Sequence, residues 1–404
     1  MKIKRIIAAA ASVVLLLSAP VFSTPAMAKT SFDLTALHIS ELSVKEFNID
    51  DYPPVLTSVE EAAAHIRESM RARQDTFYVT ISKGIYSNAE EAGLKLLADA
   101  LKETSDGREG DYLRFCLGSY QYGFVEYPQM VTLIYRATYN TTAEQEQQTD
   151  KAVSAALDSL LLRGRSEYET IKAIYDYIVT NVSYADEPDE NEPITDYSIF
   201  TAYGAAVNGK AVCQGYSMLL YRMLKDAGIS CRIISGTSKG VRHTWNIAKA
   251  NGKYYLLDVT WDVPLGGSSG GFFMKGTDDF DEFSPKSKHI AIYEYETIFS
   301  DYNSDSFKSE YPVSAVKIEP PVYTIGDIDG NGIVDGRDAT AVLTAYAVAS
   351  VRGAYPLSEE QLSAADVTGN GITDGIDASM ILSFYAASSA GKADNIIEYI
   401  QKRT

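Results

Sequence analysis

The chain has 404 residues, enough for two or three domains that each bury a core. Its composition, 46% hydrophobic and 22% charged, is typical of a globular protein. The net charge of −18 argues against nucleic acid or an anionic membrane surface as a partner, because either would repel the protein.

The N-terminus has the three parts of an export signal. Positive charges at positions 2, 4 and 5 precede an apolar stretch from Ile6 to Leu17, and Ala26-Met27-Ala28 supplies a small-residue cleavage pattern. The apolar stretch is too short to span a bilayer comfortably. We therefore expect residues 1–28 to be a signal peptide, cleavage before Lys29, and a secreted, extracellular protein with no membrane partner.

Residues 29–160 alternate between strand-like and helix-like patterns, which predicts an α/β N-terminal region. The expected elements are a strand, a helix opened by a capping box at Ser87, a second strand and a long helix, over residues 76–81, 87–101, 131–139 and 143–162. No chemistry is predicted in this region.

The chain contains three cysteines, and an odd number in a secreted protein leaves at least one thiol free. Cys116 and Cys231 lie in apolar runs and are expected in the core. Cys213 differs, because the segment GKAVCQGYSMLLYRMLKDAG predicts a helix that begins at Cys213 and ends at Gly228. A cysteine at a helix N-terminus is favoured as a thiolate, and the free N–H groups there can stabilise an oxyanion.

A β-hairpin is predicted in HTWNIAKANGKYYLLDVTWD. Asn251-Gly252 between two β-rich runs favours a type I′ turn, which pairs Ala250 with Lys253. Continuing this register makes His243 and Asp258 diagonal neighbours on one face, within side-chain reach. A carboxylate in that position can orient an imidazole and fix its tautomer.

The sequence over about residues 162–262 resembles the transglutaminase-like superfamily of papain-like cysteine enzymes. The resemblance rests on GKAVCQGYS, ISCRIISG, HTWNI and YYLLDVTWD. It implies that Cys213 is the nucleophile, His243 the general base and Asp258 the orienting carboxylate. The candidates for completing the oxyanion hole are Gln214, Tyr203 and Tyr184.

The resemblance leaves the outcome of the reaction open. Thiolate attack on a peptide or amide carbonyl gives a thioester, after which water gives hydrolysis and an amine gives crosslinking. Secreted bacterial members of the superfamily often look hydrolytic, so the resemblance favours a peptidase or amidase. We expect a protein or peptide substrate and no catalytic cofactor. A vestigial fold that only binds is a third reading, which the intact Cys213, His243 and Asp258 argue against.

Beyond a proline-containing segment predicted as a linker, residues 311–324, the sequence repeats itself with an offset of 39 residues. Each copy has oxygen-bearing side chains at alternate positions of a twelve-residue loop, the spacing of a calcium loop. The first set is Asp327, Asp329, Asn331, Ile333 (through its carbonyl), Asp335 and Asp338. The second is Asp366, Thr368, Asn370, Ile372, Asp374 and Asp377. Because Thr368 replaces a carboxylate, we expect weaker calcium binding in the second loop.

Two such loops, each followed by an apolar helix, resemble the type I dockerin module. The resemblance implies two Ca²⁺ sites, docking onto a cohesin domain of a scaffoldin, and a place in a cellulosome. It also implies partner contacts at loop positions 10 and 11, which are Gly336, Arg337, Gly375 and Ile376. The expected architecture is α+β, with an α/β N-terminal region, a papain/transglutaminase-like core over 161–310 and a small all-α dockerin over 325–404.

Overall fold

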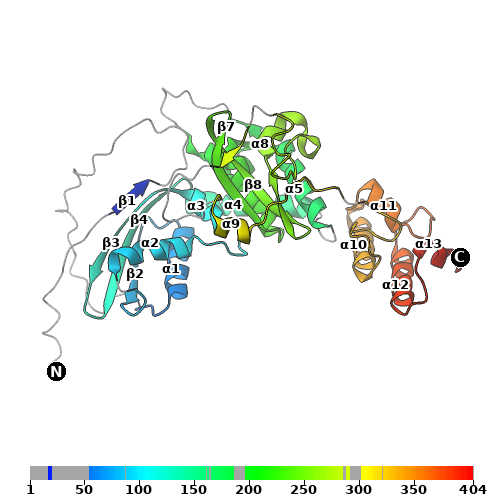
Figure 1. The fold of residues 1–404 in the computed structure, drawn as a ribbon, viewed down its shortest axis with the longest axis horizontal. Helices are drawn as coiled ribbons and strands as arrows, with labels where there is room; N and C mark the ends of the chain where they lie inside the picture. Colours follow the sequence, from blue (N-terminus) through cyan, green and yellow to red (C-terminus); the bar gives the residue numbers. More distant parts are fainter. Residues whose placement is uncertain are drawn as a thin grey trace.

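In the computed structural model of the protein, the structure describes residues 17–20, 54–86, 88–160, 162, 165–185, 196–284, 288–291, 302–320 and 322–403. The described parts lie in a row, with an N-terminal sheet, a central domain and a helical C-terminal module (Figure 1). Most of the predicted signal peptide lies outside the described residues. The mixed architecture confirms the predicted α+β class.

The N-terminal region is an antiparallel sheet with helices packed on it. Its strand order is β1-β3-β4-β2. The bounds are β1 Leu17–Pro20, α1 Val59–Arg71, β2 Thr76–Ser82, α2 Ala89–Ala100, α3 Asp111–Cys116, β3 Leu117–Glu126 and β4 Met130–Tyr139. Both strands and the helix predicted within residues 76–139 are present. The side chain of Asn88 caps α2, and the run around Cys116 is a short helix with Cys116 fully buried, as expected for a core residue.

Strand β1 lies inside the predicted signal peptide and pairs with β3, with Leu17 opposite Tyr122. If the signal peptide is removed at Lys29, β3 becomes an edge strand of this sheet.

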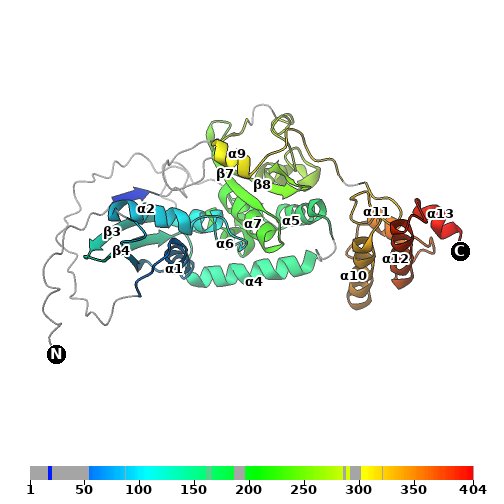
Figure 2. The same ribbon diagram turned by 60° about the horizontal axis from the view of Figure 1, so that its bottom comes forward.

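The central domain packs helix α7 against the mixed-length antiparallel sheet β10-β7-β8-β9. Figure 2 shows the long helix α4 running beneath this domain. The bounds are α4 Ala143–Leu160, α5 Glu167–Asn181, β5 Ser183–Tyr184, α6 Ala202–Ala206, β6 Lys210–Ala211, α7 Cys213–Asp226, β7 Cys231–Ser238, β8 Val241–Ala250, β9 Lys253–Leu257, α8 Val259–Asp262, β10 Ile290–Ala291 and α9 Asp305–Glu310.

The predicted hairpin is confirmed. Asn251 and Gly252 both have positive φ, 50° and 80°, as a type I′ turn requires, and Ala250 pairs with Lys253. The register continues to Asn246 opposite Leu257, where β9 ends. Asp258 is therefore not the next strand residue, but the N-cap of α8, where its side chain accepts a hydrogen bond from the Trp261 N–H.

The first part of the segment predicted as a linker packs on the central domain. Ile318 is buried in the core, its N–H donates to the carbonyl of Met274, and the Ser314 N–H donates to that of Tyr254. These contacts satisfy backbone groups that a free linker would expose to water.

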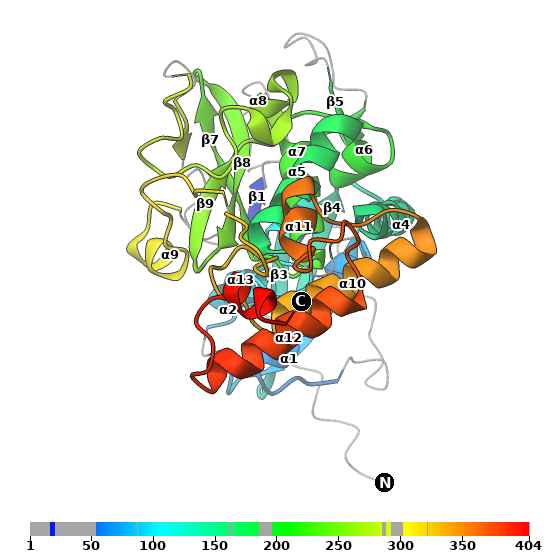
Figure 3. The same cartoon turned by 90° about the vertical axis from the view of Figure 1, so that its right-hand side faces the viewer.

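The C-terminal module contains α10 Gly336–Arg352, α11 Glu359–Ala365, α12 Gly375–Ser389 and α13 Ile396–Gln401. Helices α10 and α12 lie side by side (Figure 3). Gln361 joins the module to the central domain, because its buried amide donates both to Glu169, at 2.7 Å, and to the carbonyl of Ile328, at 2.9 Å. Among the described residues, none of the helices is both long and apolar enough to cross a membrane.

Candidate active site

Cys213 occupies the first position of α7, directly after its N-cap residue Val212. The helix is held close to its surroundings by Gly215, where a Cβ would lie 2.7 Å from the carbonyl oxygen of Ile199. The buried amide of Asn246 on β8 donates to the Ser217 carbonyl of α7 at 3.0 Å. These contacts fix the helix start against the strand that carries His243.

The imidazole of His243 lies between the other two predicted catalytic side chains. Its Nε2 is 2.6 Å from Oδ2 of Asp258. The imidazole also lies close enough to Cys213 to lower the pKa of that thiol. His243 and Asp258 are buried, while Cys213 is partly accessible. The three residues predicted from sequence are thus brought together, although Asp258 reaches the site from a helix cap and not from a strand.

The hydrogen bonds determine the tautomer of His243. The indole Nε1 of Trp261 also lies 2.9 Å from His243 Nε2, but both nitrogens cannot donate to one another. Because a carboxylate only accepts, Nε2 carries the proton directed at Asp258. That leaves Nδ1 free of the proton and able to act as a base, while Trp261 covers the imidazole–carboxylate pair.

The ionisation of the three groups is coupled through charge. Burial acts to raise the pKa of Cys213, but the hydrogen bond and charge of His243, together with Thr244, outweigh it and lower the pKa. Burial acts to lower the pKa of His243, but Asp258 and then Cys213 raise it to about 10. For Asp258, burial opposes ionisation, but His243 and His289 hold its pKa below the ordinary value. The arrangement favours a thiolate beside an imidazolium.

The other two cysteines have the opposite environment. Cys116 and Cys231 are fully buried. Burial raises the pKa of Cys116 to about 12 and also raises that of Cys231. Both are core residues, as predicted.

Two further side chains belong to the site and were not found from the sequence. His289 Nε2 lies 3.0 Å from Oδ2 of Asp258, and its Nδ1 lies 2.7 Å from Oδ1 of Asp281. His289 follows Asp258 by 31 residues, outside the hairpin on which the pairing argument depended. The only signal in the sequence is that the chain has four histidines, of which this one follows the acidic run TDDFDEF.

The side chains of His243, Asp258 and His289 present ligand atoms within 4.8 Å of one another, a separation that a metal ion could also use. However, 2.6 and 3.0 Å are direct hydrogen-bond lengths between imidazole and carboxylate. The described side chains of this cluster are therefore hydrogen-bonded directly to one another.

The three candidate oxyanion donors have different environments. The Gln214 amide donates to the Phe200 carbonyl at 3.0 Å, so it is engaged with the preceding loop. Tyr203 lies partly buried on α6, which packs against α7. Tyr184 is 40% exposed and stacks on Tyr216, one helical turn from Cys213. The choice among them stays a prediction, and Tyr184 has the most accessible position.

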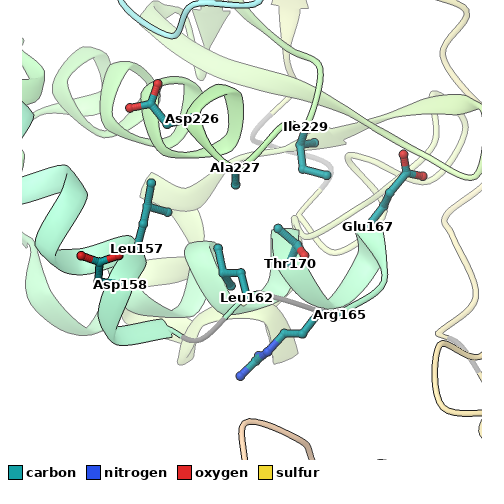
Figure 4. Close-up of a pocket in the computed structure, with 9 residues that line it drawn as sticks. All are labelled: Leu157, Asp158, Leu162, Arg165, Glu167, Thr170, Asp226, Ala227 and Ile229. Atoms are coloured by element: carbon teal, nitrogen blue, oxygen red, sulfur yellow. The ribbon is translucent and has the colours of Figure 1, made fainter. Parts of the chain in front are cut away.

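A surface hollow lies near the other end of α7 (Figure 4). It is lined by residues of α4, α5, the end of α7 and the loop that follows α7, among them Leu157, Asp158, Thr170, Asp226 and Ile229. Since α7 has 14 residues and rises about 1.5 Å per residue, this hollow is roughly 20 Å from Cys213. It is not part of the site.

The first aspartate loop gathers carboxylates around a common centre. Asp327, Asp329 and Asp338 present oxygens within 4.8 Å of one another. Gly332 has a φ of 84°, which allows the sharp turn. Burial raises the pKa of Asp338 to about 6, with Asp329 adding to the shift. These carboxylates repel one another, and a hard divalent cation between them would relieve the repulsion.

The second loop has the same backbone form but a different donor set. Gly371 has a φ of 81°, and Asp374 caps α12 as Asp335 caps α10. In place of the second carboxylate, the Thr368 hydroxyl donates to Asp377 at 2.9 Å. A cation would have to replace this hydrogen bond, which agrees with the expectation of weaker binding.

The predicted partner positions begin helices α10 and α12. Arg337 folds back onto Asp335, at 2.9 Å, whereas the equivalent Ile376 is 59% exposed. Helices α10 and α12 repeat one exposure pattern. Each has an aliphatic side chain that is fully buried and two apolar side chains that are between 44% and 46% exposed. The buried pair is Val342 and Ile381, and the exposed set is Leu343, Tyr346, Leu382 and Tyr385.

Comparison with known proteins agrees with this geometry. Residues 154–259 match the model of the transglutaminase-like superfamily, and residues 325–383 match that of the dockerin type I domain. The chain contains a transglutaminase-like domain followed by a type I dockerin. This combination is that of a cellulosome-type module, and type I dockerins bind calcium.

Individual relatives cover only part of the chain. The kyphoscoliosis peptidase of Mus musculus is 28% identical over 121 residues, and that of Homo sapiens is 26% identical over 121 residues. The match spans 27% of this chain and 18% of each relative's length. A crystal structure of a TGase matches 46% of this chain and 52% of its own, with 16% identity and a TM-score of 0.26, which supports no further conclusion.

Proposed function

We propose that the transglutaminase-like domain is a thiol-dependent peptidase or amidase that uses Cys213, His243 and Asp258. The observation that carries this proposal is the position of the His243 imidazole, 2.6 Å from Asp258 and near enough to the Cys213 thiol to lower its pKa. This is the arrangement of a nucleophile, a base and an orienting carboxylate.

The proposed reaction follows from the tautomer. Cys213 gives its proton to Nδ1 of His243, while Asp258 holds the Nε2 proton and stabilises the imidazolium. The thiolate attacks the substrate carbonyl, and His243 returns the proton to the leaving nitrogen as the C–N bond breaks. Water, deprotonated by His243, then attacks the thioester and releases a carboxylic acid.

The N–H of Cys213, at the start of α7, is one proposed oxyanion donor, because first-turn N–H groups have no helical acceptor. Tyr184 is our preferred second donor, for its accessible place beside Tyr216.

Acyl transfer to an amine would use the same three residues and is the alternative. To separate the two, wild type and Cys213→Ala would be incubated with a denatured protein and a fluorescent primary amine. New peptide termini, absent with Cys213→Ala, would support hydrolysis. Amine incorporation without new termini would support crosslinking, and neither product over a broad set of proteins and peptides would contradict both enzymatic readings.

We infer that the dockerin binds Ca²⁺ in both loops and docks onto a cohesin domain of a scaffoldin. Support comes from the carboxylate cluster of the first loop and from the two matching sets of exposed apolar side chains on α10 and α12. The test is retention on immobilised cohesins with calcium and with a chelator. Retention that needs calcium and falls in Leu343→Ala plus Leu382→Ala supports docking, and retention indifferent to both contradicts it. Docking would place the enzyme outside the cell, in agreement with the predicted signal peptide.

A further inference from the structure

His289 is hydrogen-bonded at both nitrogens of its ring, next to the proposed site. Its imidazole is 2% exposed and is hydrogen-bonded at both nitrogens to carboxylates, Asp258 at 3.0 Å and Asp281 at 2.7 Å. The backbone N–H of His289 also donates to Asp281, at 3.0 Å. Because carboxylates only accept, each of these two hydrogen bonds uses a proton on the imidazole.

The fold delivers His289 to this place through a close strand contact. Strand β10 pairs with β7, with Ala291 opposite Gly236, which itself lies opposite His243 on β8. A Cβ at Gly236 would lie 2.1 Å from the Ile290 carbonyl oxygen, so only glycine lets β10 approach this closely. His289 immediately precedes β10 and is thereby held over the end of β9.

Aromatic rings enclose the imidazole on its remaining sides. The ring of Phe280 lies 4.4 Å from that of His289, centre to centre, and the ring of Trp245 lies 5.0 Å away. Water is therefore largely excluded, and the charge of His289 acts at short range on Asp258.

Imidazoles and carboxylates alternate along this chain of contacts. From the thiol inwards the order is Cys213, His243, Asp258, His289 and Asp281. Without His289, the single Oδ2 of Asp258 would be free to turn away from His243 or to take up a proton. With it, that oxygen is held between two donors, while Oδ1 accepts from the Trp261 N–H at 3.2 Å.

We infer that His289 is a positioning residue that, clamped by Asp281, holds Asp258 ionised and aimed at His243. This inference rests on the proposed function, because it concerns the same thiol site. His289 touches neither the thiol nor the substrate in this account. It acts through Asp258, which would otherwise be a buried carboxylate with one charged partner.

The groups that face this carboxylate come from every element around it. They are His243 from β8, His289 before β10, and at longer range Asp262 of α8 and Tyr175 of α5, whose ionisation Asp258 also influences. Both hydrogen bonding and charge from His289 act to keep Asp258 ionised. Its loss should therefore raise the pH at which Asp258 takes up a proton and the ion pair at Cys213 is lost.

The test is the rate of alkylation of Cys213 by iodoacetamide between pH 3 and 10, which needs no substrate. His289→Phe keeps a ring but no donor, and His289→Gln keeps one neutral N–H. The alkylation rate falls as the pH is lowered, and we call this part of the profile the acid limb. In His289→Phe we expect the acid limb to move upward by about one pH unit, because one charge-assisted hydrogen bond to Asp258 is lost. In His289→Gln the shift should be smaller. Asp281→Asn, at a side chain 29% exposed, should move the acid limb in the same direction.

His65→Gln makes the same chemical change in α1, far from the site, and should leave the profile unchanged. Thermal unfolding shows whether His289→Phe folds. If it does not, the alkylation profiles of Asp281→Asn and His289→Gln test the role of His289. Folded variants with the wild-type acid limb would overturn the role of His289 while leaving the proposed function intact. A wild-type protein that alkylates only near the ordinary thiol pKa would overturn both.

Discussion

The two carboxylate clusters of this protein are neutralised in different ways. In the transglutaminase-like domain, Asp258 is bracketed by two imidazoles at 2.6 and 3.0 Å, and its pKa is held low against the effect of burial. In the first dockerin loop, Asp327 and Asp338 accept backbone N–H groups, and burial raises the pKa of Asp338 to about 6.

The difference indicates what each region needs from outside the chain. The cluster around Asp258 pairs its carboxylate with imidazole groups from the chain itself. The dockerin cluster has three carboxylates side by side, with backbone N–H groups as their partners and the exposed Arg337 paired with the neighbouring Asp335, and this set of oxygens fits a divalent cation. The following predictions test this contrast, beginning with the largest effect.

Cys213→Ala should abolish both thiol alkylation at neutral pH and any turnover, because the other thiols are buried and their pKa values are raised. Mass spectrometry of the alkylated protein measures this. The matched control, Cys231→Ala, removes a core thiol and should keep full labelling at position 213. Labelling at Cys116 or Cys231 in folded wild-type protein would show that the thiolate is not confined to the site.

Asp258→Asn should lower the pKa of His243 from about 10 toward its ordinary value of about 6.5. The sign follows from the charge, since an amide can still accept the Nε2 proton but no longer stabilises the imidazolium. A fall of more than one unit is expected in the His243 titration, followed by nuclear magnetic resonance of the imidazole. An unchanged pKa would mean that the carboxylate does not supply the counter-charge.

Removal of calcium should destabilise the dockerin and leave Cys213 alkylation unchanged. With free calcium at a hundred times Kd, one site adds about 2.7 kcal/mol to the free energy of unfolding, which a chelator removes. Calorimetry with and without chelator measures this loss. A matching change in Cys213 alkylation would break the contrast between the two clusters.

The two dockerin loops should differ in affinity because of Thr368. Thr368→Asp restores the missing carboxylate and should tighten the second loop by on the order of tenfold. The mirror change, Asp329→Thr, should weaken the first loop by a similar factor. Titration calorimetry compares them, and equal affinities of the two wild-type loops would contradict the assignment.

The sequence was sufficient where the determining signal is local. The Asn251-Gly252 turn fixed the hairpin register, and with it the approach of His243 to Asp258. Gly332 and Gly371, both at positive φ, marked the two loop turns in the same way. A turn of two residues or a loop of twelve carries its geometry within the segment itself.

The sequence did not predict residues that are brought together by strands far apart along the chain. His289 reaches Asp258 only because β10 crosses β7 at Gly236, a contact between segments more than 50 residues apart that no short pattern encodes. The end of β9 at Leu257 was also missed, because the preference of Asp258 for a helix cap outweighed the β-rich run around it. The sequence likewise did not show that Ile318 packs into the central core.

The most direct test of the account is the pH dependence of Cys213 alkylation in wild type and in His243→Ala. The account predicts rapid alkylation of the wild-type thiol at neutral pH, because His243 lowers the pKa of Cys213. In His243→Ala, rapid alkylation should be lost or shifted to alkaline pH. Slow alkylation that is the same in both proteins, and that rises only near the ordinary thiol pKa of about 8.5, would contradict an imidazole-activated nucleophile.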